Sequence, residues 1–447
     1  MSFGAKESAP CPSNVGYTNI FCTMENDKNP RLLILCTQPY NPMNQARSLE
    51  SYFHAFDREN VFQVFSDART PVKGLCASLY QITDYQLLQR RLRKDAIVGR
   101  VFSYEDSLQQ SLDETTPLEK AKRFKSDGLY RFARKWVWKK RFWDTSAFQK
   151  WISEVAKPDA VFLCFSPDFF LFDLYDEIKR LTNAPLFLSI TDDLVFNRHF
   201  SLSPFYWAYR FLYEKRAKKA IAESRACFFV SEKMKRFYEE RLGAKGYVQY
   251  IATRLPTPSQ NPIPSCPKVA RYFGIIESGR FESLCQVADA FQAAGLETIL
   301  EVYTPSFDEI AKKKHPDNLL IKKSIPYGRV LSTMRETDLL IMVEGLKKRD
   351  QAAVAYSLST KVADSLGSGR LVLAYGGENA GLISFVKEKD ACLVATDFEG
   401  LVSLLKKMKD GNVCYKEVIE RSLLVAEECF DIETQSHLFL SRVRELL

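Results

Sequence analysis

Short apolar runs rich in β-branched and aromatic residues recur along the first half of the chain. They stand at 31–36, 61–65, 160–165, 186–190, 226–230 and 247–251. Each run is uniformly apolar rather than alternating, which is typical of strands that helices cover on both faces. Helical patterns lie between them, as at 168–182 and 207–222. A strand, helix and strand order with right-handed crossovers predicts a parallel sheet wrapped on both sides.

The same pattern starts again in the second half. Apolar runs stand at 270–276, 298–303, 318–323, 339–344, 371–375 and 391–395, with helical patterns at 281–294, 328–335, 359–368 and 398–409. The segment between the two halves, 253–268, holds five prolines. Proline fixes φ, so this segment is expected to be a semi-rigid connection between domains.

We therefore expect an α/β fold of two Rossmann-like parallel-sheet domains that face each other across a cleft. The expected parts are a loose leader (1–30), an N-terminal Rossmann-like domain (31–252), a Pro-rich hinge (253–268), a C-terminal Rossmann-like domain (269–425) and a C-terminal helix that packs back on the N-terminal domain (426–447). In such folds ligands bind beyond the carboxyl ends of the strands, so the cleft is the expected site.

Composition limits the class of protein. The chain has 447 residues, 46% of them hydrophobic and 26% charged, which is typical of globular domains and excludes a disordered, collagen-like or coiled-coil chain. The longest uncharged stretch, 8–24, is polar, and the first 30 residues lack a signal-peptide pattern. The eleven cysteines form no C-x-x-C pair, which favours reduced thiols and a cytoplasmic location.

The most informative segment for chemistry is 356–377. It predicts a hydroxyl-rich turn with Ser357, Ser359 and Thr360, and a helix that one of the last two caps. A helix N-terminus with Lys361 in its first turn favours a phosphate, and Asp364, one turn later, could accept hydrogen bonds from a ribose diol. The alternative is an ordinary capped helix with a solvated lysine.

This segment resembles the pattern Y-x-x-P/S-x-K-x-x-E-Y-x-x-x-G-x-P-V of nucleotide-sugar glycosyltransferases of the GT-B fold, particularly the retaining family-4 type. Two positions depart from it, since Asp364 replaces the usual Glu and Leu371 stands where Pro is common. A second segment, 272–291, is similar to the strand, glycine loop and helix that open the donor domain of that family. There Gly274 would permit close backbone approach and Arg280 would reach the diphosphate. The resemblance implies that Arg280 and Lys361 form a two-cation clamp on one anion and are the catalytic residues.

Further positions follow from the same resemblance. Glu344, at the end of a predicted strand, would contact the donor sugar. On the acceptor side, Arg47 ends the loop 37–47, and Asp192 or Asp193 would bind an acceptor hydroxyl. A helix-capping role for either aspartate is the alternative. The four histidines show no metal-ligand spacing and no Asp-x-Asp motif ends a strand, so we expect no metal and no cofactor other than the nucleotide sugar as substrate.

The net charge of +8 is concentrated in one segment. Between 119 and 144 stand ten Lys or Arg residues against three acids. A nucleic-acid binder would spread its basic residues over a broader face, so no nucleic acid is expected. The basic, tryptophan-containing segment 128–152, part of a helical insert at about 105–152, suits either an anionic membrane surface or a core-packed helix with solvated charges. Membrane contact would place the protein peripherally on the inner face of a membrane and favour a lipid-linked acceptor.

The expected function is a retaining glycosyltransferase of the hexosyltransferase type. It would move a sugar from a nucleotide diphosphate to a glycan or lipid-linked acceptor in polysaccharide or glycoconjugate synthesis. Two alternatives stay open: a nucleotide-sugar epimerase of the same fold, and a degenerate non-catalytic binding protein.

Overall fold

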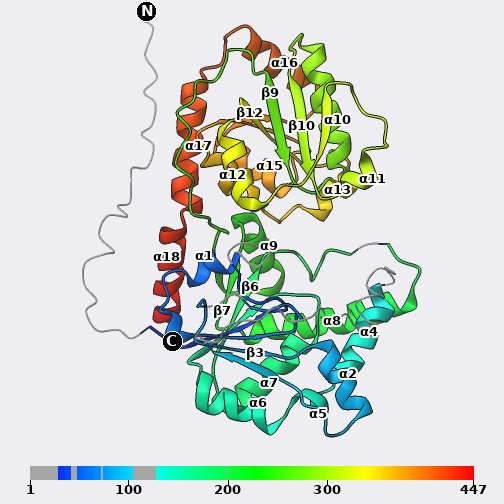
Figure 1. Ribbon diagram of the computed structural model, residues 1–447, viewed down its shortest axis with the longest axis vertical. Coiled ribbons are helices and arrows are strands. Elements are labelled where there is room, and N and C mark those ends of the chain that lie inside the picture. Colours follow the sequence, from blue (N-terminus) through cyan, green and yellow to red (C-terminus); the bar gives the residue numbers. More distant parts are fainter. Residues whose placement is uncertain (1–28, 42–47, 72–73, 104–126, 199) are drawn as a thin grey trace, which may run out of the picture.

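The computed structural model describes residues 29–41, 48–71, 74–103, 127–198 and 200–447. Two α/β domains lie one above the other, joined at one side by helices α17 and α18 (Figure 1). The predicted leader, the acceptor-side residue Arg47 and much of the predicted insert fall outside the described residues.

The N-terminal domain is built on an eight-stranded sheet in the order β4-β3-β2-β1-β5-β6-β7-β8. Its strands are β1 (Leu32–Leu35), β2 (Val61–Phe65), β3 (Ser78–Gln81), β4 (Arg100–Ser103), β5 (Ala160–Cys164), β6 (Leu186–Ile190), β7 (Ala226–Phe229) and β8 (Gly246–Val248). All neighbours are parallel except β3 and β4, which pair antiparallel at one edge. The central strands are fully buried, as their unbroken apolar runs predict.

Helices cover both faces of this sheet. They are α1 (Glu50–Phe53), α2 (Asp84–Leu92), α4 (Asp127–Val137), α5 (Lys140–Trp143), α6 (Ser146–Lys150), a π-helix (Trp151–Ala156), α7 (Phe170–Thr182), α8 (Pro204–Glu223) and α9 (Glu232–Leu242). The local sequence determines where α8 begins. Ser203 accepts a hydrogen bond from the Tyr206 amide, and Pro204 follows at the first helical position.

The C-terminal domain has a six-stranded, entirely parallel sheet in the order β11-β10-β9-β12-β13-β14. The strands are β9 (Val269–Phe273), β10 (Ile299–Thr304), β11 (Leu319–Lys323), β12 (Leu339–Val343), β13 (Leu371–Tyr375) and β14 (Leu393–Ala395). The helices are α10 (Arg280–Ala293), α11 (Phe307–Ile310), α12 (Tyr327–Arg335), α13 (Lys348–Ala353), α14 (Lys361–Leu366), α15 (Gly381–Glu388), α16 (Phe398–Lys409) and α17 (Tyr415–Phe430). This doubly wound arrangement confirms the predicted fold class.

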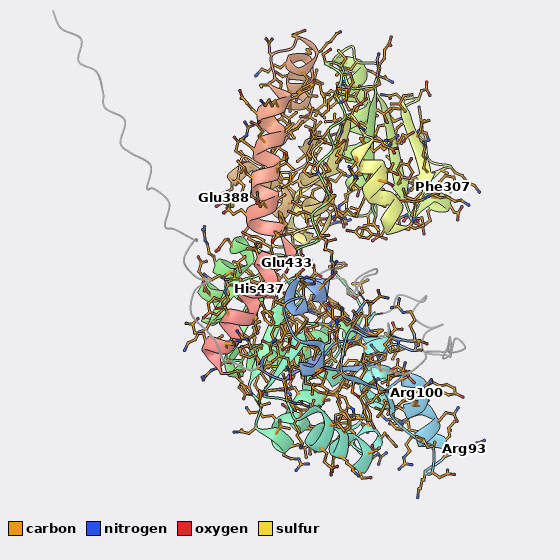
Figure 2. The ribbon with its side chains drawn as sticks, turned by 60° about the vertical axis from the view of Figure 1, so that its left-hand side comes forward. Arg93, Arg100, Phe307, Glu388, Glu433 and His437 are labelled. Carbon is orange, nitrogen blue, oxygen red and sulfur yellow. The ribbon has the colours of Figure 1, made fainter. Side chains whose placement is uncertain are left out.

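Two chain segments cross between the domains side by side. The segment 253–268 is irregular, and Thr253 forms a bridge with Asp431, the residue between α17 and α18 (Ile432–Leu446). The predicted C-terminal helix 426–447 is divided at Asp431, because the Asp431 side chain caps α18 by accepting a hydrogen bond from the Thr434 amide. The helix α18 then lies on the N-terminal domain, with Phe439 in ring contact with Phe53. Figure 2 shows Glu433 on α18 near the junction, where it is hydrogen-bonded to His54.

The basic segment 128–152 is not one helix. It bends into α4, α5 and α6, and Trp143, placed by its sequence spacing on the same stripe as Trp136, lies fully buried in a separate helix. Trp138 also packs in the core, stacked on Phe170 with ring centroids 3.7 Å apart. Most tryptophan side chains of this segment are therefore buried in the core, whereas Trp136 is exposed. Within the described residues, no helix combines the length and apolarity that a bilayer crossing needs.

Candidate functional site

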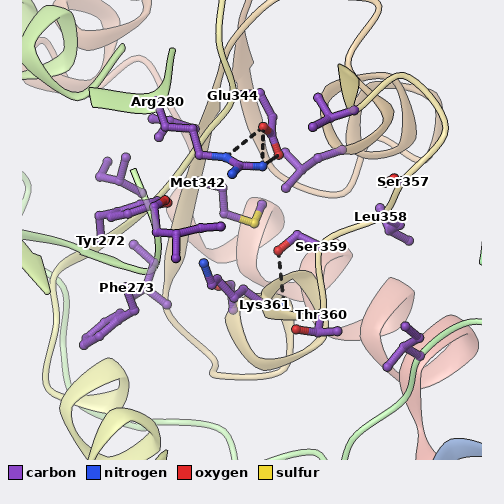
Figure 3. A pocket seen from close by; sticks show the side chains of 18 of the residues that line it. Tyr272, Phe273, Arg280, Met342, Glu344, Ser357, Leu358, Ser359, Thr360 and Lys361 are labelled. Carbon is purple, nitrogen blue, oxygen red and sulfur yellow. Dashed lines mark hydrogen bonds and ion pairs between the residues drawn. The ribbon is translucent and has the colours of Figure 1, made fainter. Parts of the chain in front are cut away.

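A cavity of about 540 Å³ opens between the two domains. The N-terminal domain contributes Ser48, Thr191, Asp192 and Ile251. The larger part of the wall comes from the C-terminal domain, from the ends of β9 and β12 and the loop before α14. These are carboxyl ends of parallel strands, the edge at which α/β folds place their ligands. In Figure 3, Arg280 and Glu344 lie on one side of this space and Ser359 and Lys361 on the other.

Arg280 and Glu344 form a bidentate ion pair inside the cavity. Arg280 is the first residue of α10, and its Nε and Nη2 donate to the two carboxylate oxygens of Glu344 at 2.9 and 3.1 Å. Glu344 follows β12, which lies beside β9, so adjacent strands deliver both groups. Burial raises the pKa of Glu344, although the charges of Arg280 and Lys361 act in the opposite direction. Glu344, which was predicted to contact the donor sugar, is therefore ion-paired with Arg280, and the sequence spacing does not indicate this pairing.

Lys361 reaches the same space from the other side. Its ammonium lies against Gly274, where a Cβ atom would overlap Nζ, and 5.5 Å from the centroid of the Tyr272 ring. The Gly274 backbone has φ of +152°, which L side chains rarely adopt. The close approach that Gly274 permits is therefore that of the Lys361 ammonium. Arg280, Lys361 and Gly274 are brought together, as the resemblance implies.

The hydroxyl-rich turn differs in detail from its prediction. Ser359 Oγ accepts a hydrogen bond from the Lys361 amide at 3.4 Å, while Thr360 stands at the N-cap position without a side-chain capping bond. The helix α14 runs only from Lys361 to Leu366, shorter than the predicted 359–368. So short a helix has a weak dipole, and the positive potential here comes mainly from Lys361.

A second cavity of about 300 Å³ adjoins the first, sharing Phe273, Met334, Thr360 and Lys361 with it. Its wall includes the aromatic residues Phe273, Tyr303 and Tyr327, and we call it the aromatic cavity. Phe273 stacks on Tyr303 with centroids 5.0 Å apart and planes 14° apart. Asp364 lies here, buried, and accepts a hydrogen bond from the Tyr327 hydroxyl at 2.9 Å. No local motif in the sequence indicates this cavity, because Phe273 and Tyr303 belong to separate strands, β9 and β10, which only the sheet brings side by side.

The two acceptor-side aspartates have different roles. Asp193 accepts hydrogen bonds from the Phe196 amide at 2.9 Å and from the Tyr238 hydroxyl at 2.8 Å, so it holds the turn in place. Burial, followed by the charge of Asp193, raises the pKa of Tyr238. Asp192 instead lines the cleft and accepts a hydrogen bond from Ser357 Oγ of the other domain at 2.9 Å. Asp193 thus holds a turn and caps no helix, since the next helix, α8, begins at Pro204, and Asp192 faces the cleft.

The described part of the chain holds no cluster of three or more His, Cys, Asp or Glu side chains with the geometry of a metal site. Metal-independent binding of the diphosphate remains a prediction that rests on the cations of the cavity.

Comparison with known proteins identifies the fold. No family model matches the chain, and no curated protein sequence matches it. Among solved structures, the chain is similar to HepE from Anabaena in complex with UDP and glucose, with a TM-score of 0.56 and 10% identity over 93% of this chain and 99% of that one. It is also similar to sucrose-phosphate synthase from Thermosynechococcus elongatus, with a TM-score of 0.58 and 9% identity over 93% and 98%. The chain has the GT-B fold, as its sequence predicts. At this identity the likeness shows the fold alone.

Proposed function

We propose that this protein is a glycosyltransferase that takes a sugar from a nucleotide diphosphate donor bound in the cleft. The observation that supports this most directly is the convergence of Arg280 and Lys361 on one cavity at the carboxyl edge of the C-terminal sheet. A diphosphate needs fixed positive charge, and fixed charge in a cleft between two domains acts more strongly than in bulk water. The complex of HepE with UDP and glucose supports a nucleotide-sugar ligand for this fold.

The two adjoining cavities suggest how the donor lies. The nucleoside occupies the aromatic cavity, where Phe273 and Tyr303 offer ring surface and Asp364 offers a carboxylate oxygen to a ribose hydroxyl. The diphosphate lies at Lys361, which lines both cavities, and within reach of Arg280. The sugar then enters the larger cavity, toward Glu344 and the acceptor side at Asp192.

The reaction that fits this arrangement is transfer with retention of the anomeric configuration. As the bond between the sugar and the diphosphate breaks, negative charge grows on the leaving phosphate, and Lys361 and Arg280 stabilise it. The acceptor hydroxyl approaches on the same face of the sugar and gives its proton to the leaving phosphate oxygen. Of the two carboxylates in the larger cavity, Glu344 is paired with Arg280 and Asp192 with Ser357. Neither is presented as a nucleophile, and Asp192 is placed to orient the acceptor.

The acceptor in this proposal is a glycan or a lipid-linked sugar, and the product belongs to polysaccharide or glycoconjugate synthesis. The protein works at the cytoplasmic side of the cell. Closure of the two domains would exclude water from the cleft, so that transfer competes well with hydrolysis of the donor.

A thermal-shift screen with UDP, GDP, CDP and ADP tests the proposal first, because a ligand held by the native state raises the melting temperature. We expect one of the four to stabilise the wild-type protein and to lose that effect in Lys361→Ala. Incubation with the matching labelled nucleotide sugars then separates the alternatives. Transfer to an acceptor supports the proposal, interconversion of the free sugar nucleotide would reveal an epimerase, and binding without turnover would reveal a degenerate binding protein. An unchanged melting temperature with all four nucleotides would contradict the proposal.

A further inference from the structure

The solvent-facing side of α8 has an unusual composition. Its exposed positions from Phe205 to Lys219 carry apolar residues in the first half and lysines in the second half, and the exposed acid that follows, Glu223, lies 3.7 Å from the Lys219 ammonium. The large apolar residues exposed on this helix and just before it are Phe200, Leu202, Phe205, Trp207, Phe211 and Leu212. We call this set, with Lys215, Lys218 and Lys219, the α8 face.

A surface helix of a globular protein normally turns one apolar stripe to the core and polar residues to water. The inner side of α8 follows that rule, with Tyr209 and Tyr213 buried. The outer side does not, because the side chains of Phe200, Leu202 and Phe211 are 85%, 88% and 69% exposed. Apolar residues gathered in this way on one surface mark an interaction site rather than the scattered exposure of an ordinary surface.

The neighbouring helix α4 extends the same surface. It packs against α8, with the rings of Phe132 and Phe205 6.4 Å apart. Leu129 and Trp136 of α4 are exposed, and so are its basic residue Lys135 and the following Lys139. Figure 1 draws α4 and α8 next to each other on one side of the N-terminal domain, with α2 beside them. Farther along that domain, Figure 2 shows Arg93 and Arg100 directed outward.

We propose that the α8 face docks the protein on an anionic lipid bilayer. Aromatic and leucine side chains would enter the interface at the level of the headgroups, while the lysines meet the negative surface charge. Charge complementarity favours this occupant over a second copy of the chain, because a symmetric contact would oppose the lysines with apolar residues or with each other, whereas anionic headgroups supply negative charge. The two leucines of the face, Leu202 and Leu212, lie among its aromatic residues and suit the acyl boundary of a bilayer, a role that stacking on nucleic-acid bases does not use.

The location of the α8 face connects docking to the cleft. The segment that begins at Thr191 and Asp192, in the wall of the cavity, runs directly to Phe200 and on into α8. A docked protein would therefore hold the acceptor side of its cleft close to the bilayer. The consequence, which rests on the proposed function, is that the acceptor is a lipid-linked sugar whose reacting hydroxyl stands near the membrane surface.

The test is co-sedimentation of the full-length protein with vesicles of phosphatidylcholine alone and of phosphatidylcholine with 30% phosphatidylglycerol, a composition of about one anionic lipid in three. We expect binding to the anionic vesicles that weakens at high salt. The triple variant Phe200→Ser, Leu202→Ser and Phe211→Ser should lower the partition coefficient at least tenfold. The double variant Lys215→Gln and Lys219→Gln should lower it about tenfold on anionic vesicles only.

Matched controls lie in the C-terminal domain. Leu424→Ser removes a leucine that is 65% exposed from α17, and the pair Lys406→Gln and Lys407→Gln removes two exposed lysines from α16. These variants should sediment as the wild type does. Equal loss in the controls, no sedimentation of the wild type, or a stable dimer that the triple variant dissociates would overturn the proposal. Nucleotide binding is measured by thermal shift on each variant, so that failure of the docking proposal can be distinguished from failure of the proposed function. A protein that binds nucleotide but does not bind vesicles would refute only the docking proposal.

Discussion

Arg280 and Glu344 face each other in the wall of the cleft and share two hydrogen bonds, at 2.9 and 3.1 Å. Both side chains are largely buried, at 14% and 4% exposed. Glu344 thus neutralises one of the two cations to which we assign the binding of a diphosphate. With Glu344 ionised, Arg280, Glu344 and Lys361 together carry a net charge of +1. Protonation of Glu344 would raise this net charge to +2.

The first prediction concerns pH. Burial raises the pKa of Glu344 above the ordinary value of about 4.3. An anionic diphosphate beside Arg280 would raise the pKa of Glu344 further, so donor binding should take up a proton and affinity should increase as pH falls through the raised pKa of Glu344. Calorimetric titration with the nucleotide sugar, in two buffers of different ionisation enthalpy, measures this uptake directly. A nucleotide sugar is the right probe because its diphosphate does not itself titrate at weakly acidic pH.

Glu344→Gln is the matching variant. It removes the titrating group, so proton uptake should vanish and affinity should become nearly independent of pH over the range in which the wild type responds. The sign for stability follows from the same shift: the contribution of Glu344 is present at low pH and is lost as pH rises through its raised pKa, and the variant should flatten that dependence. Proton uptake that persists in the variant would assign the effect to another group.

The second prediction concerns the two cations themselves. Lys361→Ala and Arg280→Ala should each lower turnover at least a hundredfold, a loss of about 3 kcal/mol of transition-state stabilisation, without unfolding the protein. Lys348→Ala and Arg349→Ala, which remove exposed cations from α13, serve as controls and should retain wild-type rates. Wild-type turnover in either cavity variant would refute a role for that residue in charge stabilisation.

The sequence predicts those features of the structure that depend on a few neighbouring residues, and it does not predict those that depend on contacts between distant segments. The buried parallel strands are visible because each is an unbroken apolar run, whereas β3 was missed because it places Ser78 and Gln81 in buried positions. The edge strand β4 was missed because three of its four residues are exposed. Arg280 and Lys361 were identified from their local motifs. The pairing of Arg280 with Glu344, 64 residues away, depends on strand order in the sheet, which no local pattern specifies.

The third prediction uses Gly274. A Cβ at this position would overlap the Lys361 ammonium, and the backbone φ of +152° also disfavours a side chain. Gly274→Ala should therefore displace the lysine and weaken nucleotide binding at least tenfold. Gly411→Ala is the matched control, since Gly411 has φ of +73° but nothing within 4 Å of its Cβ position. It should cost about 1 kcal/mol of folding stability, as a left-handed alanine does, and leave binding unchanged. Equal nucleotide affinity in the two variants would contradict the prediction.

The fourth prediction separates the two neighbouring aspartates. Asp193→Ala removes the acceptor of two hydrogen bonds and leaves the Tyr238 hydroxyl without its partner, so we expect a loss of about 2–3 kcal/mol in the free energy of unfolding. Asp192→Ala should leave the free energy of unfolding within about 0.5 kcal/mol of the wild type, because its side chain lies at the surface of the cleft. Its effect should instead appear as a raised KM for the acceptor found with labelled nucleotide sugars, at unchanged affinity for the donor.

Ser357→Ala distinguishes the two possible reasons for that effect. It removes the same hydrogen bond between the domains as Asp192→Ala does, but it keeps the carboxylate at the acceptor side of the cleft. If Asp192 orients the acceptor hydroxyl, Ser357→Ala should keep the wild-type KM for the acceptor while Asp192→Ala raises it about tenfold or more, as expected for loss of a hydrogen bond to a charged group. If both variants raise KM equally, the bond between Asp192 and Ser357 matters only for holding the two domains together.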